Sequence, residues 1–171
     1  MTITPYSLCV PAYQRGLTVL ARLLEKADAH VIANSLNPDE MLQARLAPDM
    51  LNLIGQVQRA SDTAKNSIRR LTGRDVPAFE DAETSFAQLQ ERVAKTLALF
   101  DAVSEADYAG SAERPIEMKF PGITLNLSGL EYLQQFALPN FYFHVTTAYD
   151  LLRHKGVSIG KLDYLGFVQP A

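Results

Sequence analysis

The sequence predicts an all-α protein, an up-down four-helix bundle with one small β-hairpin between the third and fourth helices. Four segments carry apolar residues at the three-and-four spacing of a helix that buries one face, and a fifth segment alternates apolar and polar residues, which is typical of strands. With 171 residues, of which 47% are hydrophobic, the chain can bury one well-filled core. We therefore expect a single domain over residues 1–171, in which the apolar stripes of the helices meet at a common axis.

The first helix is expected to run from Pro5 to about Asn34. Pro11 lies close to its start, where a proline bends or delays the first turns without ending the helix. The run Ser35–Pro38 then breaks the pattern. The apolar stripe of this helix consists of Tyr6, Val10, Tyr13, Leu17, Leu20, Leu24, Ala27 and Val31.

The second helix is expected to open at Leu46–Asp49, after a single extra turn over residues 38–45. Pro48 and Asp49 would then lie in its first turn, where a missing N–H and a negative charge are both tolerated. Gly73 is expected to close this helix as a left-handed cap. The buried stripe is Met50, Leu53, Val57, Ala60, Ala64, Ile68 and Leu71.

A loop over residues 74–81 leads to a third helix from about Glu83 to Val103. Between Ala109 and Leu127 the period changes to that of strands, and Pro121–Gly122 marks the turn of a hairpin. Pro-Gly suits a type II turn better than the primed turns that hairpins prefer. The alternating apolar residues are Ile116, Met118 and Phe120 in one strand and Ile123, Leu125 and Leu127 in the other.

The fourth helix is expected from Ser128 to Gly156. Ser128 and Glu131 have the spacing of a capping box, and Gly156 follows a last turn rich in basic groups. The tail after this helix keeps enough apolar residues that we expect it to pack on the bundle or on a partner chain. The buried stripe is Leu130, Leu133, Ala137, Val145, Ala148 and Leu151.

Two polar residues, Asn140 and His144, fall within the apolar stripe of the fourth helix. Residues four apart lie on one helix face, so both side chains are expected to point into the core, where polar groups need partners. One reading is a ligand or metal site, with room opened by a kink at Pro139. The other is purely structural: hydrogen bonds across the bundle to Gln56, Asn52 or a tyrosine, which specify register.

The remaining candidate side chains carry weaker signals. Asn is a poor transition-metal ligand, and the second helix offers only Asp49, Asn52 and Gln56 near its buried stripe. His30 and His154 lie near helix C-termini, where positive charge is favoured, so neither receives a role. Cys9 is expected to be a small buried hydrophobe.

Aromatic residues surround the fourth helix on all sides. They indicate either the face of a homodimer or cover by the hairpin and the C-terminal tail. These residues are Phe136, Phe141, Tyr142, Phe143 and Tyr149.

Composition excludes several partners. A net charge of −3, with both signs interspersed, offers no basic face for nucleic acid and no polybasic run for a membrane surface. A single cysteine cannot form an internal disulfide, which fits a reducing cytoplasm. Charges interrupt every long apolar stretch and the N-terminus lacks a secretory pattern, so we expect a soluble cytoplasmic protein.

Three long motifs resemble a known family. They are RLAPDM at Arg45–Met50, the run Val76–Thr96, and ALPNFYFHVTTAYDLLRHKGVSIGK at Ala137–Lys161. Together they are similar to the bacterial domain-of-unknown-function family 1993, which is placed in the DinB-like (DinB/YfiT-like metalloenzyme) superfamily. The resemblance covers most of the chain and implies a DinB-like four-helix bundle that often forms homodimers.

The resemblance also implies where a metal would bind. In the wider superfamily, one histidine on the second helix and a His-x-x-x-His pair on the last helix bind a divalent metal, and some members use low-molecular-weight thiols. Asn140 and His144 match the positions of the pair, and Gln56, with Asp49 behind it, is the best counterpart of the remaining histidine. One of three imidazoles is present, so the resemblance implies an incomplete triad.

Three functions follow as expectations. The first is a cytoplasmic bundle that lacks the full metal triad and binds a small molecule or a partner. The second is a divergent thiol-dependent transferase or hydrolase, in which His144, Asn140 and Gln56 or Asp49 hold a divalent ion such as zinc or nickel whose bound water acts as nucleophile or base. The third is a non-catalytic structural homodimer.

Overall fold

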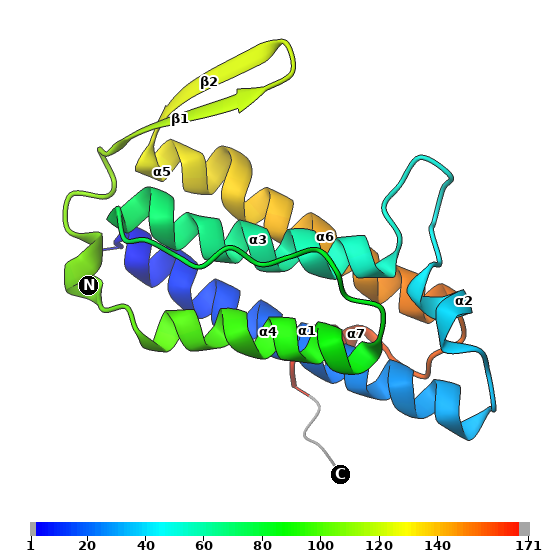
Figure 1. The fold of residues 1–171 in the computed structure, drawn as a ribbon. Helices are drawn as coiled ribbons and strands as arrows, with labels where there is room; N and C mark the ends of the chain where they lie inside the picture. The colour runs from blue at the N-terminus through cyan, green and yellow to red at the C-terminus, as the bar shows by residue number, and fades with distance from the viewer. Residues whose placement is uncertain (1–2, 168–171) are drawn as a thin grey trace.

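The computed structural model describes residues 3–167 and consists of four long helices with short elements between them (Figure 1). The long helices are α1 (Pro5–Ala33), α3 (Leu53–Thr72), α4 (Phe86–Asp101) and α6 (Leu138–His154). The predicted all-α bundle with one hairpin is confirmed. The shorter elements are α2 (Pro38–Leu42), a 3-10 turn (Glu105–Tyr108), β1 (Pro115–Phe120), β2 (Ile123–Ser128), α5 (Gly129–Tyr132), a π-helical turn (Leu133–Ala137) and α7 (Lys161–Leu165).

The connection between α3 and α4 decides the directions of the helices. Residues 73–85 run back along α3 for the length of the bundle before α4 begins (Figure 1). As a result α3 and α4 run in the same direction, while α1 and α6 run in the opposite one. The directions therefore do not alternate strictly along the chain, because this connection is a crossover rather than a short turn.

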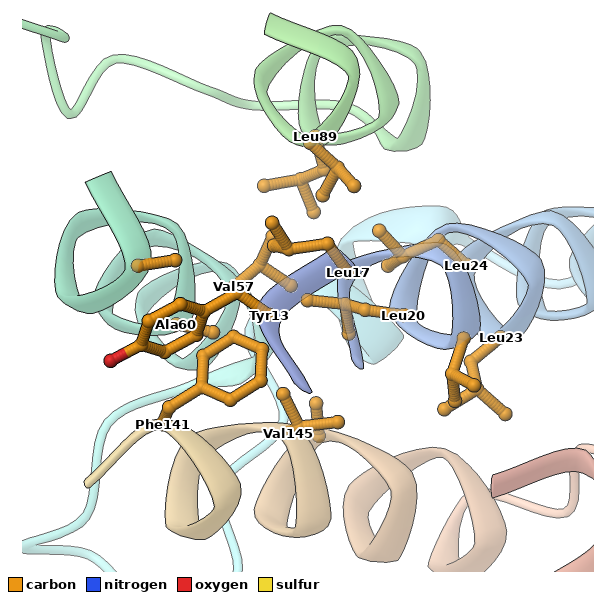
Figure 2. Packing of buried hydrophobic residues seen from close by; sticks show 14 of the residues in the cluster. Tyr13, Leu17, Leu20, Leu23, Leu24, Val57, Ala60, Leu89, Phe141 and Val145 are labelled. Carbon is orange, nitrogen blue, oxygen red and sulfur yellow. The ribbon is translucent and has the colours of Figure 1, made fainter. Parts of the chain in front are cut away.

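The core lies between the four long helices, and α4 contributes Phe86, Leu89, Val93 and Phe100 to it. Figure 2 shows Phe141 and Val145 of α6 facing Tyr13 and Leu17 of α1. The rings of Tyr13 and Phe141 meet edge to face with centroids 4.9 Å apart. Both rings are fully buried, and such pairs stabilise a core beyond their buried area.

The predicted start of the second long helix is wrong. Leu46–Asp49 lies in an irregular segment, and α3 begins at Leu53, with Asn52 as the N-cap. The side chain of Asn52 accepts a hydrogen bond from the N–H of Gly55 at 2.9 Å. Asn52 supplies the acceptor that a helix start needs, which a proline cannot do. The predicted left-handed cap at Gly73 is confirmed, with φ of 77°.

The start of the fourth long helix is confirmed, but its predicted stripe is wrong at one position. Ser128 and Glu131 form the capping box, whereas Leu130 is 36% exposed. The reason is the π-helical turn over Leu133–Ala137, in which the N–H of Leu138 bonds the carbonyl of Leu133. One extra residue in this turn rotates the preceding residues. Tyr132 therefore faces the core in place of Leu130, beside the predicted Leu133.

The hairpin forms in the predicted register. Phe120 pairs with Ile123 across the turn Pro121–Gly122, and Gly122 has the positive φ of 79° that a type II turn requires. Both predicted ends of α4 also move. The helix begins at Phe86 instead of Glu83, because Ser85 is its N-cap, and it ends at Asp101 instead of Val103.

The tail packs on the bundle, as expected for its apolar content. Lys26 of α1 forms an ion pair with Asp163 of α7 at 2.6 Å, and the ring of Tyr164 meets that of Tyr149 on α6. Residues 168–171 of the predicted tail lie outside the described residues.

Candidate functional site

His144 lies on the face of α6 that packs against α3. The residue is 9% exposed, and its Nδ1 lies 2.8 Å from the side-chain oxygen Oε1 of Gln56. Gln56 is in the first turn of α3 and is fully enclosed. The structure therefore brings together two of the three residues that the sequence singled out, along a contact that joins the two helices.

The partners of Gln56 fix the protonation of the imidazole. The Nε2 of Gln56 donates to the carbonyl oxygen of Leu51 at 3.0 Å. Because a carbonyl oxygen can only accept, the amide nitrogen must face Leu51 and the oxygen Oε1 must face His144. An amide oxygen cannot donate, hence Nδ1 of His144 carries the proton and donates to it. In the neutral ring this leaves a lone pair on Nε2.

The environment keeps this ring neutral. Burial, with the Arg59 guanidinium nearby as the second cause, lowers the pKa of His144 from 6.5 to about 4. At neutral pH the ring is therefore an acceptor at Nε2 and a donor at Nδ1.

Asn140 lies one turn before His144 and is half-buried. Its Nδ2 donates to the hydroxyl of Thr63 on α3 at 2.8 Å, and that hydroxyl donates to the carbonyl of Arg59 at 2.7 Å. The amide oxygen of Asn140 accepts no hydrogen bond from residues 3–167. Asn140 and His144 thus each tie α6 to α3, at neighbouring turns.

The donor set does not fit a tightly bound divalent metal. The oxygen of Gln56 is occupied by Nδ1 of His144, and Asn140 turns its nitrogen toward Thr63, so a single imidazole nitrogen remains. A catalytic zinc site needs three good protein ligands. Over residues 3–167, no three His, Cys, Asp or Glu side chains gather in a way that would hold an ion.

The other sequence candidates lie elsewhere. Asp49 is exposed in the irregular segment before α3, and His154 is exposed at the end of α6. His30 lies near the end of α1, beside Asn34. Cys9 is buried, and burial raises the pKa of its thiol to about 12, which leaves it an inert hydrophobe as predicted.

Sequence reasoning missed two members of this site, Thr63 and Arg59. Thr63 follows Gln56 by seven residues, which is two helical turns, so helical spacing alone places the two on one face of α3. Two apolar residues in contact with His144 or Gln56 are also exposed. Phe143, whose ring meets that of His144, is 54% exposed, and Leu51, whose carbonyl oxygen accepts from Gln56, is 42% exposed. The ring of Phe143 lies edge-on to the ring of His144, with centroids 5.3 Å apart.

Comparisons with known proteins agree with this fold. The sequence model of the domain of unknown function DUF1993 matches residues 6–165, nearly the whole chain. The chain belongs to the DUF1993 family. A crystal structure of a DinB family member from Shewanella denitrificans matches with a TM-score of 0.87 and 42% sequence identity, covering 97% of this chain and 93% of that one. No curated protein matches.

Membership in DUF1993 and the likeness to a DinB family member confirm the resemblance that the motifs indicated. They establish a family and a helical bundle, and assign no reaction. Within residues 3–167 of this DUF1993 chain, every helix is too short or too polar to span a lipid bilayer.

Proposed function

We propose that this DUF1993 protein is a cytoplasmic bundle that binds a small molecule, and that the ligand donates a hydrogen bond to Nε2 of His144. The observation that carries the proposal is the bond from Nδ1 of His144 to Gln56, which directs the lone pair of the neutral ring to Nε2. Among residues 3–167, no side chain or backbone group hydrogen-bonds Nε2. A largely buried acceptor without a protein partner is suited to a ligand.

The surroundings of Nε2 narrow the class of ligand. The exposed side chain of Phe143 places apolar surface beside the imidazole. The positive charge of the nearby Arg59 guanidinium disfavours a cationic ligand at this position. The best match is a neutral molecule with a hydroxyl or N–H group next to an apolar or aromatic portion.

Phenol and toluene test this proposal directly. Both carry an aromatic ring, and only phenol carries the donor. With ¹⁵N-labelled protein, we expect phenol to shift the Nε2 resonance of His144, and toluene to shift it far less. Equal shifts with the two probes, or none with phenol, would contradict the proposal. The exposed ring of His154 serves as the internal control.

The competing function is a divergent metalloenzyme, and a restored triad distinguishes it. In protein purified without an affinity tag, we expect zinc and nickel to be sub-stoichiometric. The double variant Gln56→His, Asn140→His supplies the two missing imidazoles and should gain metal. Stoichiometric metal in the natural sequence that disappears in His144→Ala would support the enzyme and overturn our proposal.

Several of the aromatic side chains around α6 pack within the chain itself. Phe141 is buried in the core, Phe136 packs against Phe120 of the hairpin, and Tyr149 packs against Tyr164 of α7. The hairpin and the tail therefore cover part of the aromatic face of α6, and Phe143 is 54% exposed. A homodimer remains part of our proposal.

A further inference from the structure

The β-hairpin has one apolar face and one polar face. The polar face carries Glu117 and Lys119, whose charged groups lie 2.8 Å apart within β1. The apolar face begins against the helices and continues past them, so that Phe120 and Ile123 near the tip are exposed. In Figure 1 the hairpin projects from the bundle beside α5. Its apolar face is formed by the pairs Ile116–Leu127, Met118–Leu125 and Phe120–Ile123.

The outer edge of β1 carries unpaired backbone groups. The residues flanking a two-residue turn bond to each other, and bonded and non-bonded pairs alternate along an antiparallel ladder. Phe120, Met118 and Ile116 therefore bond to β2, while Lys119 and Glu117 direct their N–H and C=O groups outward. Across residues 3–167, no backbone group bonds these outward groups. Pro115 has no N–H and falls in the outward set, as edge strands favour.

We propose that the outer edge of β1 pairs antiparallel with β1 of a second copy, about a two-fold axis at Met118, to form a four-stranded sheet. In this register Glu117 lies opposite the partner's Lys119, and Lys119 opposite the partner's Glu117. These positions are the ones with outward backbone groups, so each facing pair exchanges two hydrogen bonds. Phe120 then lies opposite the partner's Ile116, which extends the apolar face across both copies.

Charge selects this register and this edge. The two-fold axis could also be centred at Glu117 or at Lys119. An axis at Glu117 would place two carboxylates opposite each other, and an axis at Lys119 would place two ammonium groups opposite each other. Like charges directly opposite each other destabilise a sheet, and opposite charges stabilise it. The outward residues of β2 include Thr124 and Asn126, which have no charge to set a register. A two-fold pairing also closes on itself, so it yields a dimer and not a fibre.

The size of the contact sets the expected strength. Two short strands bury less than the roughly 1,200 Å² of a stable protein interface, so the dimer should be concentration-dependent. The ion pairs are exposed to solvent, so added salt should weaken it. This inference is independent of the ligand proposed for His144.

A charge-reversal series tests the register. Sedimentation equilibrium at low ionic strength should show a monomer–dimer equilibrium for the natural sequence. Glu117→Lys alone opposes lysines, and Lys119→Glu alone opposes glutamates, so each single variant should shift strongly to monomer. The double variant Glu117→Lys, Lys119→Glu restores opposite charges and should dimerise like the natural sequence. An equimolar mixture of the two single variants should form a heterodimer.

Two controls keep the result interpretable. Lys95→Glu makes the same charge change at an exposed position on α4 and should leave the dimer intact. Cooperative thermal melts verify that each monomeric variant is folded. A natural sequence that is monomeric at every concentration would overturn the inference. So would single variants that dimerise normally, or a double variant that does not recover.

Discussion

Nδ1 of His144 and Oε1 of Gln56 lie 2.8 Å apart, and this hydrogen bond joins the second turn of α6 to the first turn of α3. One turn away, Asn140 and Thr63 form a second bond of the same length. These two side-chain bonds, one turn apart on α6 and two turns apart on α3, fix how far one helix slides along the other. The two polar residues within the apolar stripe of the fourth long helix thus form a hydrogen-bonded junction with α3.

The stability of the protein should depend on pH through His144. Its pKa is about 4 in the folded state and 6.5 in the unfolded chain, so between these values the unfolded state binds more protons. The free energy of unfolding must therefore rise with pH in this window. We expect His144 to lower the free energy of unfolding by about 2 kcal/mol between about pH 7 and about pH 5.

Urea unfolding of the natural protein and of His144→Gln measures this effect. The free energy of unfolding of the variant should depend less steeply on pH. His154→Gln, on an exposed ring, should keep the natural slope.

Removing either side of the His144–Gln56 bond should destabilise the fold. His144→Ala leaves a buried amide oxygen without its donor, which costs about 1–3 kcal/mol. Gln56→Ala should destabilise for the same reason. Because each single variant already breaks the bond, the double variant should lose about 0.5–1.5 kcal/mol less than the sum. Denaturant curves for the four proteins give this coupling energy, and additive losses would show that the bond contributes nothing.

The start of α3 shows a limit of sequence reasoning. Pro48 and Asp49 have the residue types of a helix start, but the side chain of Asn52 accepts from the N–H of Gly55 in the first turn and also donates to Gln43 at 2.6 Å. Asn52→Ala should therefore destabilise by about 1 kcal/mol, the usual loss of an N-cap. Asp49→Ala, at an exposed position outside the helix, should change stability by less than about 0.5 kcal/mol. Thermal melts of the two variants decide between the two starts, and the opposite order would favour the start that the sequence predicted.

Helical periodicity predicted most of the fold because the apolar stripes are long. It also predicted that Asn140 and His144 face inward, and it named Gln56 as a partner. It could not predict the π-helical turn that exposes Leu130, because one inserted residue leaves no compositional signal. Nor could it predict the hydrogen bond from Asn140 to Thr63, since that contact depends on how α3 and α6 cross.

Gly16 is required by the ring of Phe141. A Cβ atom at residue 16 would lie 2.5 Å from Cε1 of Phe141, and Tyr13 packs edge-on against that ring, which leaves it no free space. Overpacking costs about 1–3 kcal/mol, partly offset by the better helix propensity of alanine. We expect Gly16→Ala to lower the melting temperature, and Phe141→Leu to recover part of this loss when the two are combined. Gly160→Ala meets no atom within 4 Å and should have little effect.

Arg92 holds the crossover connection onto the bundle. Its side chain is 2% exposed, and its guanidinium binds three carboxylates, on Asp62, Asp81 and Glu83, at 2.8–3.1 Å. Burial alone would raise the pKa of Glu83, but hydrogen bonds from Gln58 and Arg92 hold it below its usual value. Asp81 and Glu83 belong to the connection between α3 and α4, whereas Asp62 belongs to α3 itself. The charge of Arg92 therefore joins the connection to both helices.

Arg92→Met should destabilise the protein by about 3–5 kcal/mol, because Glu83 loses its cationic partner in a largely buried position, while Asp62 and Asp81 keep only their pairs with Arg59 and Lys65. The loss should appear first in residues 73–85. Their amides should exchange with deuterium faster in the variant than in the natural protein, whereas the exchange of α1 should change less. Lys95→Ala breaks an exposed pair with Glu91 on the same helix and should cost less than about 1 kcal/mol. If exchange in residues 73–85 stayed unchanged in Arg92→Met, contacts other than this cluster would hold the connection in place.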